Sequence, residues 1–130
     1  MANTVKAEVD QKSQFDQIEP WLLDHETLHA VYDLKWAGTG FVAITNLRLL
    51  FYDKDFGRKR KALTSLPFNK VTSVSSVDEG ELFCSTSELV ILAGSKEFEF
   101  EFRGGEKAQR AYRLIMGELL RDGPPSVRNR

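Results

Sequence analysis

Alternation between apolar and polar residues runs through the middle of the chain and predicts a series of short β-strands. Segments 28–36, 47–52 and 97–103 carry an apolar side chain at every second position. Because successive side chains of a strand point to opposite faces, each of these strands is expected to have one buried face. Shorter or weaker strands are expected at 41–45, 61–66, 71–77, 82–84 and 88–92.

The C-terminal part of the chain changes to a helical spacing. Apolar residues fall on one stripe over residues 106–121, and the Gly-Pro-Pro sequence at 123–125 ends the predicted helix. Near the N-terminus, Phe15, Ile18 and Trp21 have the spacing of a short helical turn, which Pro20 interrupts. Residues 1–14 are polar and lack periodicity, so they are expected to form a loose arm.

About seven short antiparallel strands followed by one amphipathic helix predict a mainly β fold. Strands of this length hide their edges by curling into a barrel or sandwich, and a single helix covers the open end. We therefore expect a split antiparallel barrel capped by the C-terminal α-helix. Residues 22–121 are the expected domain, with a partly flexible N-terminal arm at 1–21 and a flexible tail at 122–130.

Composition and charge narrow the function classes. The 130 residues include 18 Lys and Arg against 19 Asp and Glu, a balance that does not indicate nucleic-acid binding. Cys84 is the single cysteine, which suits a reducing cytoplasm, and the sequence has neither a signal pattern nor an apolar run of membrane-spanning length. With two His residues, the chain offers little for metal binding or acid–base catalysis, so no cofactor and no metal are expected.

Four segments, at residues 22–26, 41–52, 66–74 and 88–92, resemble the bacterial pleckstrin-homology-like domains, and two motifs within them are the most similar. Residues 45–51 read Thr-Asn-Leu-Arg-Leu-Leu-Phe, similar to the T-x-x-R-L-x-F core, and residues 66–71 read Leu-Pro-Phe-Asn-Lys-Val, similar to the I-P-Y-x-K-I segment. GRAM-type domains share both features. The resemblance covers roughly residues 22–121 and implies a split seven-stranded barrel with a C-terminal helix. It also implies a binding or scaffold module, and some members of the group form ring-like homo-oligomers through their strand edges.

A dense basic run lies in the expected loop after residue 53 and is the first candidate binding site. Its members are Lys54, Arg58, Lys59, Arg60 and Lys61. The run either binds an anionic membrane surface or phosphate-bearing partner, or is an ordinary solvated loop that Asp53 and Asp55 partly neutralise. Eukaryotic phosphoinositide-binding members of the resembled family use a basic first hairpin, whereas residues 35–40 of this chain contain a single Lys.

The segment His25-Glu26-Thr27-Leu28-His29 matches H-E-x-x-H, the helical zinc motif of metalloproteases. The strand pattern from residue 27 opposes that interpretation, because on a strand the two His residues lie about 13 Å apart at roughly 3.3 Å per residue. A small metallohydrolase is therefore the remote alternative, and Cys84 paired with either His is a weaker nucleophile hypothesis. The sequence predicts that the chain is not an enzyme.

An acidic row is the last candidate with a chemical character of its own. Glu97, Glu99 and Glu101 share one face of the expected strand at 97–103. Carboxylates at this spacing repel one another unless basic side chains lie next to them. These residues are therefore expected to pair with Lys or Arg on an adjacent strand or subunit.

The favoured hypothesis is a non-enzymatic binding or assembly module that forms homo-oligomers, with its ligand unassigned. The open edges of a split barrel, together with more aromatic residues than one small core requires, motivate it. Trp21, Phe56 and Phe68 are the predicted oligomer-interface residues. A second copy of the chain is the expected partner, and another protein or an anionic membrane surface are the alternatives.

Overall fold

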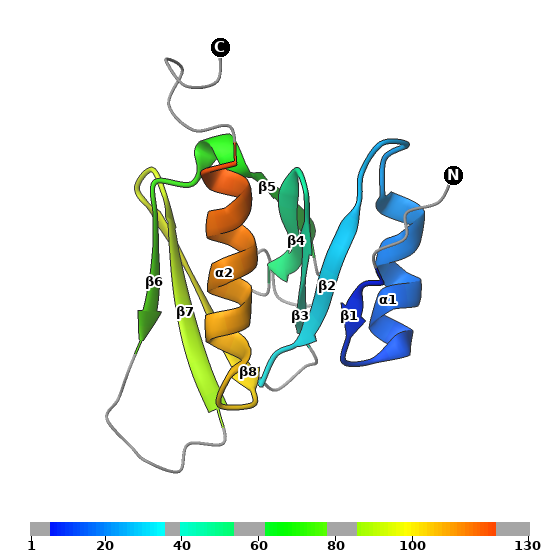
Figure 1. Cartoon of the computed structure of the whole chain (residues 1–130), viewed down its shortest axis with the longest axis horizontal. Coiled ribbons are helices and arrows are strands. Elements are labelled where there is room, and N and C mark those ends of the chain that lie inside the picture. The colour runs from blue at the N-terminus through cyan, green and yellow to red at the C-terminus, as the bar shows by residue number, and fades with distance from the viewer. Residues whose placement is uncertain (1–5, 36–39, 54–61, 78–85, 122–130) are drawn as a thin grey trace.

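The computed structural model describes residues 6–35, 40–53, 62–77 and 86–121. Figure 1 shows how the elements within these ranges follow one another. In chain order they are β1 (Glu8–Val9), α1 (Lys12–Ile18), η1 (Glu19–Trp21), β2 (Leu28–Asp33), β3 (Phe41–Thr45), β4 (Arg48–Asp53), β5 (Ala62–Pro67), η2 (Phe68–Lys70), β6 (Ser73–Val77), β7 (Thr86–Ala93), β8 (Lys96–Arg103) and α2 (Lys107–Leu119), where η denotes a 3-10 helix.

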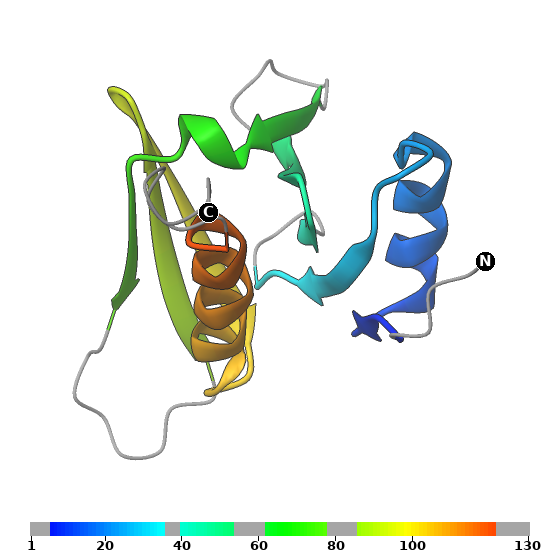
Figure 2. The same cartoon turned by 45° about the horizontal axis from the view of Figure 1, so that its top comes forward.

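The strands form two sheets that meet at one corner. The first sheet has the order β1-β2-β3-β4-β5 and the second the order β6-β7-β8. After β2, Leu34 forms an antiparallel bridge with Phe102 of β8, and the Lys35 N–H donates to the Glu101 carbonyl oxygen at 2.7 Å. Helix α2 lies between the two sheets (Figure 2). This arrangement confirms the predicted mainly β fold, a split barrel with a C-terminal helix.

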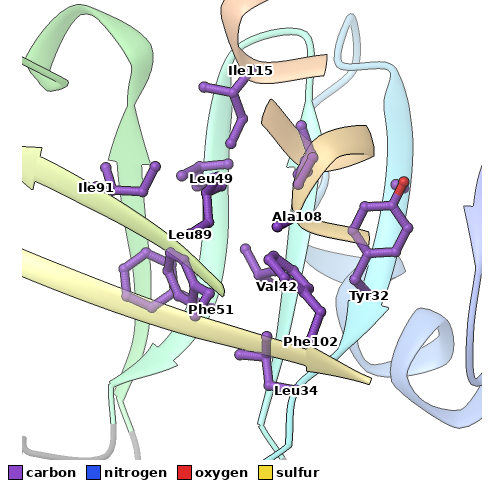
Figure 3. Packing of buried hydrophobic residues seen from close by; sticks show 14 of the residues in the cluster. Tyr32, Leu34, Val42, Leu49, Phe51, Leu89, Ile91, Phe102, Ala108 and Ile115 are labelled. Carbon is purple, nitrogen blue, oxygen red and sulfur yellow. The ribbon is translucent and has the colours of Figure 1, made fainter. Parts of the chain in front are cut away.

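The main core fills the space between the sheets and α2 (Figure 3). The alternation of β8 explains its part in this core, because Phe100 and Phe102 are buried while Glu97 and Glu99 face solvent. Residues Ala108, Ala111 and Ile115 give α2 its buried stripe, as the 3.6-residue spacing predicts. Opposite them, Tyr32 and Phe102 meet edge to face with ring centroids 5.8 Å apart.

A second apolar cluster lies on the outer face of the first sheet. Ile18 of α1 packs there with Val31, Ala43 and Leu50 of strands β2, β3 and β4. Residues Phe15 and Leu22 complete the contact from the α1–η1 segment. The predicted helical turn around residue 15 is thus confirmed, although α1 begins at Lys12 and η1 accommodates Pro20 in its first turn.

The prediction of a loose arm over residues 1–14 is wrong for the part that the structure describes in strand and helix. Residues Glu8–Val9 form β1, which pairs in parallel with β2 at Ala30 and Val31. The polar residues of this segment are held in place by ion pairs with α2. Glu8 pairs with Arg110, and Asp10 pairs with Lys107. The Tyr32 hydroxyl also donates to Glu8 at 2.8 Å.

The seven observed strands β2 to β8 correspond to predicted strands within a few residues. The expected strand at 82–84 lies outside the described residues, as does Trp36 at the end of the predicted strand 28–36. Within the described ranges, α1 and α2 are each too short or too polar to cross a membrane.

Candidate functional site

A buried ion pair joins the start of β4 to the turn before β2. The Glu26 side chain is 0% exposed and that of Arg48 is 16% exposed. Arg48 binds the carboxylate with two parallel bonds, from Nε to Oε2 at 2.8 Å and from Nη2 to Oε1 at 2.7 Å. This two-point geometry fixes the orientation of both side chains.

Thr45 and Asn46 extend this pair into a network that closes the turn between β3 and β4. The Thr45 hydroxyl donates to Glu26 Oε2 at 2.7 Å and accepts the N–H groups of Leu47 and Arg48, both at 3.0 Å. Asn46 Oδ1 accepts the Thr27 N–H at 2.7 Å. The T-x-x-R pattern at residues 45–48 is therefore a structural device that holds the turn to Glu26.

The electrostatics of the network favour the charged state of Glu26. Burial alone would raise the pKa of this carboxyl, but hydrogen bonds from Arg48, the Leu23 N–H and Thr45, together with the guanidinium charge, lower the pKa below its usual value of 4.5. The hydrogen bond to Glu26, together with the charge of that carboxylate, raises the pKa of Arg48 above its usual value. The pair consequently stays ionised at neutral pH, with the two charges cancelling each other.

Beside the pair, an open pocket lies on the outer face of the first sheet. Its cavity volume is ≈ 460 Å³. Its lining residues come from η1, β4 and β5: Trp21, Arg48, Leu50, Tyr52, Leu63 and Ser65. Trp21 is 58% exposed, so the pocket has an accessible aromatic wall. Arg48 spans the two features, since it donates to the Trp21 carbonyl oxygen at 2.9 Å and to Ser65 Oγ at 2.9 Å.

The two sheet edges of the second sheet differ in character. Strand β6 pairs with β7 on one side and has no strand on its other side within the described residues. It reads Ser-Val-Ser-Ser-Val, carries no charge, and exposes Ser73, Ser75, Ser76 and Val77. In Figure 1 it forms the left margin of the molecule. An uncharged strand without proline at an open edge is competent to pair with another strand.

The opposite edge, β8, carries the acidic row. Glu101 lies 4.0 Å from Lys35 Nζ, which agrees with the expected pairing to a basic residue. Glu97 and Glu99 have Leu92 and Val90 as their cross-strand neighbours, and the hydrogen bond between the two Glu side chains raises the pKa of Glu97. The expected pairing is thus present at Glu101 and not at the other two positions among the described residues.

The residues of the H-E-x-x-H segment do not form a metal site. His29 lies on β2, where its Nε2 is 2.7 Å from Glu118 Oε2 of α2, while His25 lies in the preceding turn and Glu26 binds Arg48. Among the residues that the structure describes, no group of three or more His, Cys, Asp or Glu is arranged to hold a metal ion. Cys84 lies outside those residues.

The other predicted site residues divide into three groups. Trp21 is exposed, as an interface residue must be. Phe68 is 8% exposed and belongs to the main core, so its assignment to an oligomer interface is wrong; η2 turns its ring inward, where α2 packs against η2. Phe56 and the basic residues Lys54, Arg58, Lys59, Arg60 and Lys61 lie outside the described residues.

The sequence did not single out the pocket or the β6 edge. Tyr52, Leu63 and Ser65 come from two strands and become neighbours only when β4 pairs with β5, so no local motif marks them. The β6 edge had a usable signal, because a charge-free Ser-Val run is unusual for an exposed edge strand.

Comparisons with known proteins agree with this architecture. A family model described as bacterial PH domain matches residues 1–118. The uncharacterized protein YozO of Bacillus subtilis (strain 168) is 27% identical over 94 residues, which cover 72% of this chain and 79% of that protein.

Two crystal structures share the fold. The pleckstrin homology domain from Shewanella amazonensis SB2B is 22% identical, with a TM-score of 0.62 over 88% of this chain and 92% of that one. A DUF1696 family protein with a pleckstrin-homology domain from Shewanella loihica PV-4 is 19% identical, with a TM-score of 0.56 over 88% and 97% of the two chains.

Proposed function

Because this chain belongs to the bacterial PH domain family, we propose that it is a non-enzymatic assembly module in which β6 of one copy pairs with β6 of a second copy. The observation that carries the proposal is the uncharged, exposed edge of β6. An antiparallel pair of identical edges places like residues near one another across a two-fold axis, which neutral Ser and Val side chains tolerate.

The contrast with β8 supports self-pairing of β6. If two β8 edges paired, the exposed carboxylates of Glu97 and Glu99 would face those of the second copy and repel them. Inward or edge charges of this kind block strand pairing in many sheets. The β6 edge carries no charged side chain. Pairing of two β6 strands would join the three-stranded sheets of the two copies into one six-stranded sheet.

Charge substitutions at Ser75, in the middle of β6, test this pairing. Both Ser75→Lys and Ser75→Glu place like charges near each other across the two-fold axis, so each is expected to weaken association at least about tenfold. Multi-angle light scattering and sedimentation velocity over a concentration series measure the mass and the dissociation constant. Gln109→Lys, at an exposed position of α2, is the matched control and should associate like the unmodified chain.

Two outcomes contradict the proposal. A strict monomer at high concentration removes homo-oligomerisation altogether. If Ser75→Lys strengthens association while Ser75→Glu weakens it, β6 pairs with an acidic surface such as the β8 edge instead of with itself.

The alternative function is peripheral binding to an anionic membrane through residues 54–61, and its support is the sequence alone. The full-length chain should then co-sediment with phosphatidylserine-containing vesicles at low salt. Changing residues 58–61 to Ala should remove that binding, since each basic residue near the surface contributes about 1 kcal/mol. Lys70→Ala with Arg113→Ala, at exposed positions elsewhere, is the control. Binding that survives the first change, or that is insensitive to salt, rejects this alternative.

A further inference from the structure

The pocket beside Arg48 continues the second apolar cluster over β4 and β5, where none of the described elements covers it. Segment α1–η1 covers this cluster over β2 and β3, where Ile18 is fully buried. Over β4 and β5 the floor of the pocket is Leu50 and Leu63, and the rim is exposed at Trp21 and Ser65. An apolar floor with an exposed aromatic side chain at its rim is the usual composition of a recognition groove.

The polar side of the pocket offers hydrogen-bond donors. Arg48 has five N–H groups, of which four donate to Glu26, Trp21 and Ser65. The fifth, on Nη1, has no partner among the described residues. Ser65 Oγ accepts from Arg48, so its own hydrogen is directed elsewhere. Since Arg48 and Ser65 both line the pocket beside Trp21, each brings to it one donor that no bond between described residues uses.

Among the described residues that line the pocket, the charge favours a neutral acceptor. Glu26 holds Arg48 in a two-point ion pair, so the guanidinium brings no net charge to the pocket. A carboxylate or phosphate would gain little there, whereas a peptide carbonyl oxygen matches the two donors. Segments in the polyproline II conformation leave their carbonyl oxygens without internal partners and lose little entropy on binding, and aromatic grooves with nearby donors recognise them.

We propose that this pocket, formed by Trp21, Arg48, Tyr52, Leu63 and Ser65 over Leu50, binds a proline-containing extended segment of a partner protein. A proline ring packs against the Trp21 indole and Leu63, and the adjacent carbonyl oxygen accepts from Arg48 Nη1 or Ser65 Oγ. The site lies on the first sheet, away from the β6 edge, so its test is separate from that of oligomerisation.

Titration of the full-length chain with acetyl-(Pro)6-amide, followed by two-dimensional ¹H–¹⁵N NMR, tests the proposal. We expect a saturable shift of the Trp21 indole N–H and of the Ser65 amide, and no shift with acetyl-(Gly-Ser)3-amide. Trp21→Ala should raise the dissociation constant by about tenfold or more, and Ser65→Ala by about threefold. Leu23→Ala is the matched control, because Leu23 is also 58% exposed but does not line the pocket, and it should bind like the unmodified chain.

Three results would overturn the proposal: no saturable shift at millimolar peptide, equal affinity of Trp21→Ala and the unmodified chain, or equal loss in Trp21→Ala and Leu23→Ala. The last result would mean that the peptide binds exposed apolar surface without using the pocket. The amide spectrum of each variant reports whether its fold is intact, so unfolding is not mistaken for lost binding.

Discussion

The Arg48→Met variant is expected to lose roughly 3–5 kcal/mol of its free energy of unfolding, because removing one partner of a buried ion pair leaves the other charge uncompensated. The Glu26 carboxylate is fully buried, and Met cannot donate to it. The same change removes the bonds to Ser65 and to the Trp21 carbonyl oxygen. Urea denaturation followed by circular dichroism measures the loss.

Two further variants test whether the loss of stability comes from the burial of the charge and not from the loss of an ion pair alone. Lys12→Met breaks an ion pair with Asp16 of 3.1 Å in which both side chains are exposed, Lys12 at 83% and Asp16 at 54%. Its cost should stay below about 1 kcal/mol. Glu26→Leu combined with Arg48→Met should lose less than the sum of the single changes, because no lone charge stays buried. A loss of under about 1 kcal/mol in Arg48→Met would contradict the argument.

The cost of Arg48→Met should also depend on pH. In the folded chain the pKa of Glu26 lies below its usual value of 4.5, so the stability from the ionised carboxyl is present above that value and is lost as the pH falls through the folded pKa. In the variant the folded pKa of Glu26 rises, because the Arg48 hydrogen bonds and charge are gone. The stability difference between the two chains should therefore be largest at neutral pH and narrow below about pH 4.

The Phe102→Ala variant is expected to lose roughly 3–5 kcal/mol, because it leaves a cavity where both sheets and Tyr32 meet. Phe102 is 0% exposed, contacts Tyr32 edge to face, and forms the bridge to Leu34 that joins the sheets. Partial collapse cannot fill the space, since rigid strands approach it from two directions. Denaturation midpoints and slopes give the change.

The same strand supplies its own control series. Phe98, Phe100 and Phe102 share one face of β8, yet Phe98 is half-buried whereas the other two are buried. Phe98→Ala should cost less than about 2 kcal/mol, with Phe100→Ala and Phe102→Ala above it. Equal losses at all three positions would show that cavity size at the sheet corner does not set the cost.

The barrel strands and α2 were predictable because the pattern of burial repeats along them. On β8 every second residue is Phe, and on α2 the residues Ala108, Ala111 and Ile115 follow the helical period. Strand β1 was not predictable in this way, because two residues are too few to show a period. Its partners, Lys107 and Arg110, lie about a hundred positions further along the chain.

The candidate sites were harder to predict for a similar reason. The Thr-x-x-Arg pattern at residues 45–48 is visible in the sequence. Its structural role depends on hydrogen bonds from Thr45 and Arg48 to Glu26, which lies about twenty residues earlier in the chain. Phe68 is one of the aromatic residues counted beyond the needs of one small core, which predicted an interface position, yet it is buried where α2 packs against η2. The pocket requires the pairing of β4 with β5 and the placement of Trp21 by η1, neither of which a local motif records.

The contacts of β1 with the first turns of α2 set a limit on the order in which the chain is completed during synthesis. Lys107 and Arg110, which bind Asp10 and Glu8, are separated from them by 97 and 102 residues. Strand β1 therefore leaves the ribosome long before its ionic partners exist. The seam between β1 and α2 therefore cannot close until residues 107–110 have been made, and these contacts carry a larger loop-closure cost than the hairpin contacts within each sheet. Strand β1 can pair with β2 soon after both are synthesised, whereas its ion pairs with α2 must wait for that helix.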